Sequence, residues 1–262
     1  QDFEAALKAY KALTWGSYYQ EALNRVEGMV NKELLVRTER IFRTTEEAYI
    51  TVQLRNIENL KLSAYKLNLE AYFRKSHGIT GVENLDLALI EPDRKWEVSV
   101  KGYGNYLPLE EKIEIDMDGP GVYAVTVSSE DLEATTLVIR SDIDLIMKSS
   151  RKEVLVFIQD MVKNKAVPGA RVLLTDGKRV LLEEETGKDG VLLRELPELT
   201  SAGNVNVFAS LDGHIAATGL DISSLVPGTG LSPKGYIYTD QPAYRPGQVV
   251  NMKGILREVT KG

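Results

Sequence analysis

The chain has 262 residues, of which 43% are hydrophobic and 27% charged, a composition typical of globular protein with room for about two domains. Its net charge of -6 and its scattered Lys and Arg residues argue against a nucleic-acid surface. Cysteine is absent, which excludes disulfides, thiolate-bound zinc and thiol nucleophiles in this segment. No apolar run approaches the roughly 20 residues needed to span a bilayer, so we expect no membrane segment here.

Residues 1–32 are predicted to form a helical segment. Apolar residues recur at three- and four-residue spacing over residues 3–13 and again over residues 19–30. Trp15-Gly16-Ser17 separates the two patterns, and Ser17 is the expected N-cap of the second helix. The pair indicates an αα-hairpin or, as an equal alternative, a helical leader whose packing partners lie outside this segment. Because the chain opens without a Met or a signal-peptide pattern, we expect a processed piece of a longer protein.

From Leu34 onward the apolar period falls from 3.6 to about 2 residues, which is typical of half-buried strands. We therefore predict a first antiparallel β-sandwich over residues 33–140, with turn signals such as Glu91-Pro92-Asp93 between its strands. The stretch Leu69–Lys75 is compatible with either a short helix or a strand end. The strand candidates cover residues 34–40, 48–55, 61–67, 96–100, 112–116, 122–127 and 135–139.

A second antiparallel sandwich is predicted over residues 141–223. Asp176-Gly177 and Asp212-Gly213 mark tight hairpins, because such turns need a positive φ. Domain size and linker composition predict a modest interface between the two sandwiches. Residues 224–235, rich in Ser, Pro and Gly, predict a linker, and residues 236–262 predict the first strands of a truncated third domain. Strand candidates of the second sandwich cover residues 142–148, 154–160, 171–174, 180–184, 191–194, 205–211 and 214–221.

No residue pattern predicts a catalytic, cofactor or metal site. The two histidines, His77 and His214, fall in different predicted domains and lack the partners that a triad or a histidine metal site requires. Asp116 and Asp118 begin like a calcium loop, but the bidentate acid of an EF-hand is missing at the twelfth position. The adjacent carboxylates of Glu183-Glu184-Glu185 alternate between opposite faces of a strand, so neighbouring pairs form no glycosidase dyad. We expect a non-enzymatic chain without cofactor or metal.

The closing stretch, residues 236–259, is predicted to be strand, turn and strand. Pro242 and Pro246 fix φ and remove two amide donors, so their segment is no interior strand. Pro246-Gly247 suits the centre of a type II turn, whose second residue takes a positive φ. Asp240 can accept backbone amides in an Asx-turn. These residues predict architecture and not an active site.

The closing stretch and two earlier segments of the chain carry a family resemblance. Residues 153–196 are similar to the domain that comes just before a macroglobulin domain in bacterial α2-macroglobulins, and residues 33–140 fit the amino-terminal domain of that family. The family pattern often has a basic residue after its aspartate, where this chain has Gln241. The closing stretch of this chain resembles the opening of the macroglobulin domain itself. The resemblance lies in a structural signature made of Asp240, Pro242, Tyr244, Arg245, Pro246 and Gly247.

This resemblance implies a mainly β chain of tandem immunoglobulin-like macroglobulin sandwiches from a large bacterial protease trap, secreted or periplasmic. In such a trap a protease cuts a bait region, the molecule rearranges, and a thioester made from Cys and Gln captures the attacker. This chain has no Cys and no bait-like segment, so the resemblance implies a scaffold that packs against neighbouring macroglobulin domains, with target proteases met by parts outside it. The alternative is an immunoglobulin-like adhesin or carbohydrate-binding module, for which Tyr103 and Tyr106 offer a modest aromatic cluster.

Overall fold

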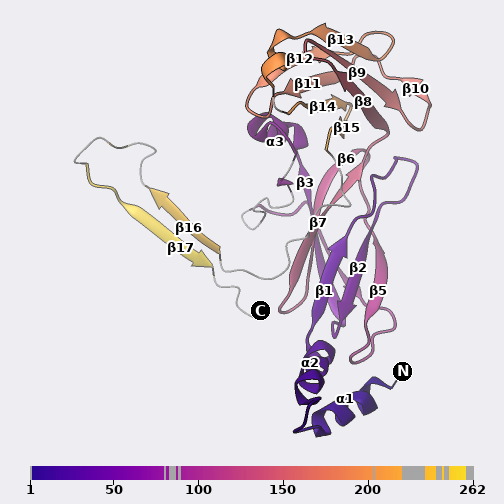
Figure 1. Cartoon of the computed structure of the whole chain (residues 1–262), viewed down its shortest axis with the longest axis vertical. Helices are drawn as coiled ribbons and strands as arrows, with labels where there is room; N and C mark the ends of the chain where they lie inside the picture. Colours follow the sequence, from indigo (N-terminus) through magenta and orange to yellow (C-terminus); the bar gives the residue numbers. More distant parts are fainter. Residues whose placement is uncertain are drawn as a thin grey trace.

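The chain is mainly β, with antiparallel sheets and three short α-helices among the residues described (Figure 1). This confirms the predicted fold class. No helix of the described part is long and apolar enough to cross a membrane. The computed structural model describes residues 2–79, 81–82, 87, 90–202, 204–219, 234–239, 244 and 248–257.

The N-terminal segment is a helical hairpin of α1 (Phe3–Ala12) and α2 (Tyr19–Val30). Asp2 caps α1, because its Oδ1 accepts a hydrogen bond of 2.9 Å from the Ala5 amide. The prediction of Ser17 as the N-cap of α2 is wrong: Tyr18 takes that position, and no side chain caps this helix end. An irregular turn leads into α2, so the chain starts the helix one residue later than the capping rule predicts.

The first sandwich packs two sheets around one apolar core. One sheet has the order β1-β2-β5 and the other β4-β3-β6-β7, all antiparallel. The stretch for which the sequence allowed either a helix or a strand end forms a helix, α3 (Leu69–Ser76). The Asn68 side chain caps this helix. The strands are β1 (Glu33–Arg37), β2 (Tyr49–Arg55), β3 (Asn59–Leu67), β4 (Arg94–Ser99), β5 (Leu109–Glu114), β6 (Gly121–Ser128) and β7 (Glu133–Arg140).

The second sandwich has a sheet in which β9 is flanked by β8, β10 and β13, and a facing sheet of order β12-β11-β14-β15. Its core includes Val156, Val172 and Val207, each fully buried. A 3-10 turn, η2 (Pro197–Ser201), precedes the last hairpin. The strands are β8 (Ile143–Ser149), β9 (Glu153–Asp160), β10 (Lys165–Ala166), β11 (Arg171–Thr175), β12 (Val180–Glu185), β13 (Val191–Glu195), β14 (Asn206–Leu211) and β15 (His214–Ala217).

A C-terminal hairpin of β16 (Lys234–Thr239) and β17 (Met252–Arg257) completes the described chain. Figure 1 shows it apart from both sandwiches, and its Ile237 side chain is 76% exposed. β16 begins two residues inside the predicted linker, and both strands lie within the predicted strand–turn–strand stretch or next to its start. The predicted domain boundaries remain predictions, and most of the linker, like residues 258–262, lies outside the described residues.

Candidate functional site at the junction of the sandwiches

The two sandwiches meet through sheets that are apolar on both faces. In β6, Tyr123 and Val125 face the first core, while Val122 and Ala124 face outward toward the second sandwich. Burial on both faces is unusual for an antiparallel sheet, which commonly leaves one face to water. The outer side chains join a separate apolar cluster between the sandwiches, made of Leu69, Phe73, Ile79, Val82, Leu87, Val122, Ala124, Leu137, Ile139, Leu173, Phe208 and Ile215.

An aromatic contact lies in this cluster. Phe73 of α3 and Phe208 of β14 are both fully buried, and their ring centroids are 5.3 Å apart with an interplanar angle of 32°. That spacing lies within the range preferred by interacting aromatic pairs. Phe208 points away from its own sandwich core, so its burial depends on the first sandwich.

The covalent connection between the sandwiches is short and hydrogen-bonded on both sides. Only Ser141 and Asp142 separate β7 from β8. The buried Ser141 hydroxyl donates to the Ile215 carbonyl at 2.7 Å and accepts from the Ile215 amide at 3.0 Å. The Asp142 carboxylate accepts from the Thr44 amide at 2.7 Å and the Thr44 hydroxyl at 2.5 Å. A connection tied to both sandwiches in this way holds their relative orientation.

Arg140, the last residue of β7, ties the connection to the first sandwich. Its guanidinium donates to the main-chain carbonyls of Met117 at 3.0 Å, Thr44 at 2.6 Å and Glu46 at 3.0 Å. Five guanidinium N–H groups in a fixed fork suit this role, because they let one side chain donate to several carbonyls at once. The loop before β2 and the turn before β6 are thus held at the start of the connection.

Ion pairs bridge the sandwiches at the margin of the apolar cluster. Arg74 of α3 donates to Glu183 of β12 at 3.0 and 2.5 Å, and Arg171 of β11 donates to Glu70 of α3 at 2.9 Å. The hydrogen bonds with Glu183, joined by those with Glu70, raise the pKa of the Arg74 guanidinium above its ordinary value. The hydrogen bond from Arg74 in turn lowers the pKa of the Glu183 carboxyl. Because these side chains are partly exposed, solvent screens the pairs and their contribution to stability is small.

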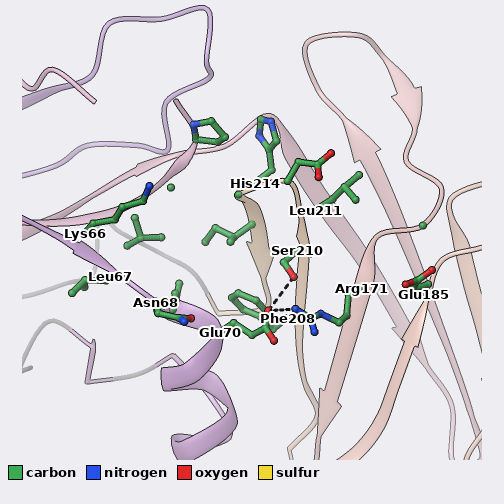
Figure 2. Close-up of a pocket in the computed structure, with 18 residues that line it drawn as sticks. Lys66, Leu67, Asn68, Glu70, Arg171, Glu185, Phe208, Ser210, Leu211 and His214 are labelled. Atoms are coloured by element: carbon green, nitrogen blue, oxygen red, sulfur yellow. Dashed lines mark hydrogen bonds and ion pairs between the residues drawn. The ribbon is translucent and has the colours of Figure 1, made fainter. Parts of the chain in front are cut away.

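A cleft of about 730 Å³ opens beside these ion pairs, between the first and second sandwiches. Figure 2 shows Glu70, Arg171 and Ser210 close together on one side, with Lys66 and His214 on other parts of the wall. Ser210 donates to Glu70 at 3.3 Å. His214 Nδ1 accepts from the Asp142 amide at 2.9 Å, so that nitrogen is not free to act as a base. Glu70, Arg171 and Ser210 thus bond to one another, and the groups named here form no nucleophile–base pair.

Both histidines serve the junction as structural residues. His77 ends α3 in the left-handed conformation with φ of 58°, and its carbonyl accepts from Thr175 at 2.8 Å and from Asn206 at 2.9 Å. His214 contacts the connection as described above. The sequence reasoning placed them in separate sandwiches and did not foresee that both lie at the contact between them.

The signature residues give little structural information. Asp240, Pro242, Arg245, Pro246 and Gly247 lie outside the described residues, and Tyr244 is described as half-buried. The predicted type II turn and Asx-turn therefore stay predictions. Within the described ranges, no group of three or more His, Cys, Asp or Glu residues is placed to hold a metal ion.

The two tyrosines of the β4–β5 loop differ in exposure and in hydrogen bonding. Tyr103 is 38% exposed and donates to Asn105 at 3.1 Å. Tyr106 is half-buried, takes a φ of 65°, and donates its amide to Asn56 at 2.7 Å. The main chain of Tyr106 therefore shapes the loop, and the carbohydrate-binding alternative stays a prediction.

Sequence reasoning missed the residues that join the sandwiches. Glu70 and Arg74 do carry a local signal, because acid and base four residues apart pair on one face of a helix. That signal depended on reading residues 69–75 as a helix. Arg171 and Glu183 carried no signal, since they are remote from α3 in sequence.

No family model matches the sequence. Among solved structures, one of native alpha-2-macroglobulin from Escherichia coli spanning domains MG0, NIE and MG1 aligns with a TM-score of 0.52 at 16% identity, over 72% of this chain and 64% of that structure. A second, spanning NIE and MG1, aligns with a TM-score of 0.51 at 15% identity, over 72% of this chain and 98% of that structure. A variant of the Salmonella alpha-2-macroglobulin gives a TM-score of 0.53 at 16% identity, over 86% of this chain and 15% of that protein.

The alignment covers nearly all of the NIE–MG1 structure. This chain spans 64% of the MG0–NIE–MG1 structure and 15% of the Salmonella protein. At identities of 15–16% the likeness concerns fold alone. It agrees with the arrangement of β-sandwiches described above. The chain is thus related, at the level of fold, to macroglobulin-domain regions of bacterial alpha-2-macroglobulin.

Proposed function

We propose that this chain is a rigid, non-catalytic scaffold in a bacterial alpha-2-macroglobulin-like protease inhibitor. The observation that carries the proposal is the junction: a two-residue connection bonded on both sides, around an apolar cluster that neither sandwich could bury alone. The fold likeness to alpha-2-macroglobulin structures supports a macroglobulin-like scaffold. Fold alone does not fix function, so protease inhibition rests on the resemblance.

A rigid junction suits such an inhibitor for a mechanical reason. Rearrangement of the inhibitor after a protease has cut its bait region requires blocks that move as units, because a displacement at one end must reach the other. Two sandwiches sharing a buried cluster behave as one block, whereas a polar interface with a loose linker would act as a hinge. On this proposal, target proteases are met by other parts of a longer periplasmic or extracellular protein, and this chain packs against neighbouring macroglobulin domains.

Limited digestion with trypsin tests the rigid block, because Arg140 offers a cleavage site within the connection. We expect the connection between Arg140 and Ile143 to resist cleavage until the sandwiches unfold, giving a single resistant product that contains both. Early separation of the two sandwiches at this point would contradict the proposal.

An inhibition assay tests the scaffold assignment. The chain is incubated with a broad-specificity protease and a large protein substrate, and a denaturing gel is examined for covalent adducts. We expect neither protection of the substrate nor an adduct, at any ratio of chain to protease. Stoichiometric protection, an adduct that survives denaturation, or peptide hydrolysis by the chain itself would overturn the assignment.

A further inference from the structure

The first sandwich has an open edge at β5. Within the described chain β5 pairs with β2 alone, and it is the outer strand of the sheet β1-β2-β5 (Figure 1). On the other side of this sandwich, β1 lies against β7 of the facing sheet. An outer strand presents a row of amides and carbonyls without strand partners, which is a template for pairing with another chain. Strand pairing at β5 is therefore open to a second copy of this chain unless its side chains prevent it.

A carboxylate interrupts the apolar side of β5. Glu111 lies opposite the fully buried Val52 of β2. Directly opposed residues of an antiparallel pair lie on the same face, so Glu111 belongs to the core face of the sheet. Leu109 and Ile113, two residues before and after it, pack in or against the first core. Alternation along the strand predicts an apolar residue at position 111, but the chain has an acid there.

The surroundings of Glu111 make its charge depend on the open edge. Its Oε2 atom is buried and has no hydrogen-bond partner among the described residues, while the residue as a whole is half-buried. Taking a carboxylate out of water without a partner is strongly unfavourable. Since the two sheets close the core side, the remaining hydration of this carboxylate comes from the open edge. A strand added at this edge would remove that hydration.

The other side chains of β5 suit pairing with a second β5. In an antiparallel twofold pair centred on residue 111, Leu109 lies opposite Ile113 of the other copy, and Glu110 lies opposite Lys112. The first pair is apolar and the second has opposite charges, and both kinds of pair stabilise neighbouring strands. In the same register Glu111 lies opposite Glu111 of the other copy, and like charges directly opposite each other destabilise. One residue therefore opposes a contact that its neighbours favour.

We propose that Glu111 is a guard residue, which keeps the β5 edge from pairing with the β5 edge of a second copy of this chain. Inward-pointing charges on edge strands are one of the means by which proteins prevent such pairing. The acid acts in two ways, because an added strand would bury it without a partner and a twofold pair would set it against its own copy. Loss of this one charge should convert the edge into a dimer contact.

Sedimentation velocity of the full chain and its variants, from about 10 to 500 μM, tests this role. We expect Glu111→Val to dimerise with an association constant at least about tenfold larger than that of the original chain. Glu111→Gln should fall between the two, because an uncharged amide costs less to bury than a charge. The matched control is Glu114→Val, since Glu114 is exposed and lies on the same strand but outside the paired residues 109–113. The control should associate no more than the original chain.

A second substitution tests the register of the pairing. In the Glu111→Val background, Lys112→Glu sets two acids opposite each other in place of an acid and a base, so dimerisation should weaken at least about fivefold. Hydrogen exchange locates the contact. The amides of β5 should exchange more slowly at high than at low concentration of Glu111→Val, and at the same rate at both concentrations of Glu114→Val.

Circular dichroism and urea denaturation check the folding of Glu111→Val. We expect it to keep its strands and to unfold at the same or a higher urea concentration, since valine favours strands and the half-buried charge is gone. Unfolding at a markedly lower urea concentration would show that the carboxylate stabilises the fold, and would overturn the proposal. Glu111→Val overturns it too if it associates no more than the original chain. Association that leaves the β5 amides unprotected, or that Glu114→Val shares, has the same consequence.

Discussion

The junction of the sandwiches and the helical hairpin are both apolar surfaces, but one is covered and the other is not. At the junction Val122 and Ile139 are 2% and 0% exposed because sheet β12-β11-β14-β15 lies over them. On the hairpin, Leu23 and Val30 are 40% and 38% exposed. An apolar pattern therefore predicts that a face requires a partner, while the identity of that partner depends on the rest of the assembly.

The strongest test of the junction is Phe208→Ala. Its ring is fully buried against Phe73 and outside its own sandwich core, so truncation leaves a cavity between the sandwiches. We expect the free energy of unfolding, measured by urea denaturation, to fall by about 3–5 kcal/mol. The unfolding curve should also broaden or split, because the sandwiches lose their coupling.

A matched control separates the junction from the general cost of removing apolar atoms. Leu193 of β13 is 54% exposed and lies outside the junction cluster. Leu193→Ala should change the free energy of unfolding by less than about 1 kcal/mol. Equal losses for the two variants would show that the second sandwich does not depend on the first.

The second test removes the guanidinium that begins the connection. Arg140→Met keeps the aliphatic length but leaves the carbonyls of Met117, Thr44 and Glu46 without this donor. We expect a loss of about 1–3 kcal/mol in the free energy of unfolding, since unsatisfied carbonyls bear their desolvation cost.

Arg94→Met is the control for that change. Arg94 donates to Asp116 at 2.6 Å, but the two side chains are 53% and 74% exposed. A surface pair of this kind contributes between about 0 and 1 kcal/mol. If Arg94→Met cost as much as Arg140→Met, the special role of Arg140 would be refuted.

The sequence predicted the strands well because their alternation is local. The strand pattern from Ala48 to Arg55 reappears as β2, and that from Val122 to Val127 reappears within β6. The helix α3 stayed ambiguous, because Leu69–Lys75 mixes aromatic and β-compatible residues with an acid–base pair at helical spacing.

The junction could not be derived in the same way. The run Val122–Val127 is apolar on both faces, which indicates cover on both sides without naming the cover. Arg74 and Glu183 lie 109 residues apart, and neither residue type nor local spacing pairs them. Long-range contacts of this sort depend on how the second sandwich packs against the first, which no local sequence pattern encodes.

The smallest expected effect concerns pH at the edge of the junction. The hydrogen bond from Arg74 lowers the pKa of Glu183, so the folded state favours the charged carboxylate more than the unfolded chain does. This contribution is present above the unfolded pKa, near 4.5, and is lost as pH falls through the lower folded value. Glu183→Gln removes the titrating group. The free energy of unfolding of the variant should therefore fall less than that of the original chain between about pH 5 and pH 3.

The control for Glu183→Gln is Glu185→Gln, two residues further along β12. Within the described chain no ion pair is found for Glu185, so its variant removes a carboxylate from the same strand without removing an ion pair. High salt should reduce the difference between Glu183→Gln and the original chain, because partly exposed charges are screened. If the free energy of unfolding had the same pH dependence in all three proteins, the ion pairs would not stabilise the junction. The buried phenylalanines and the hydrogen-bonded connection would then hold it alone.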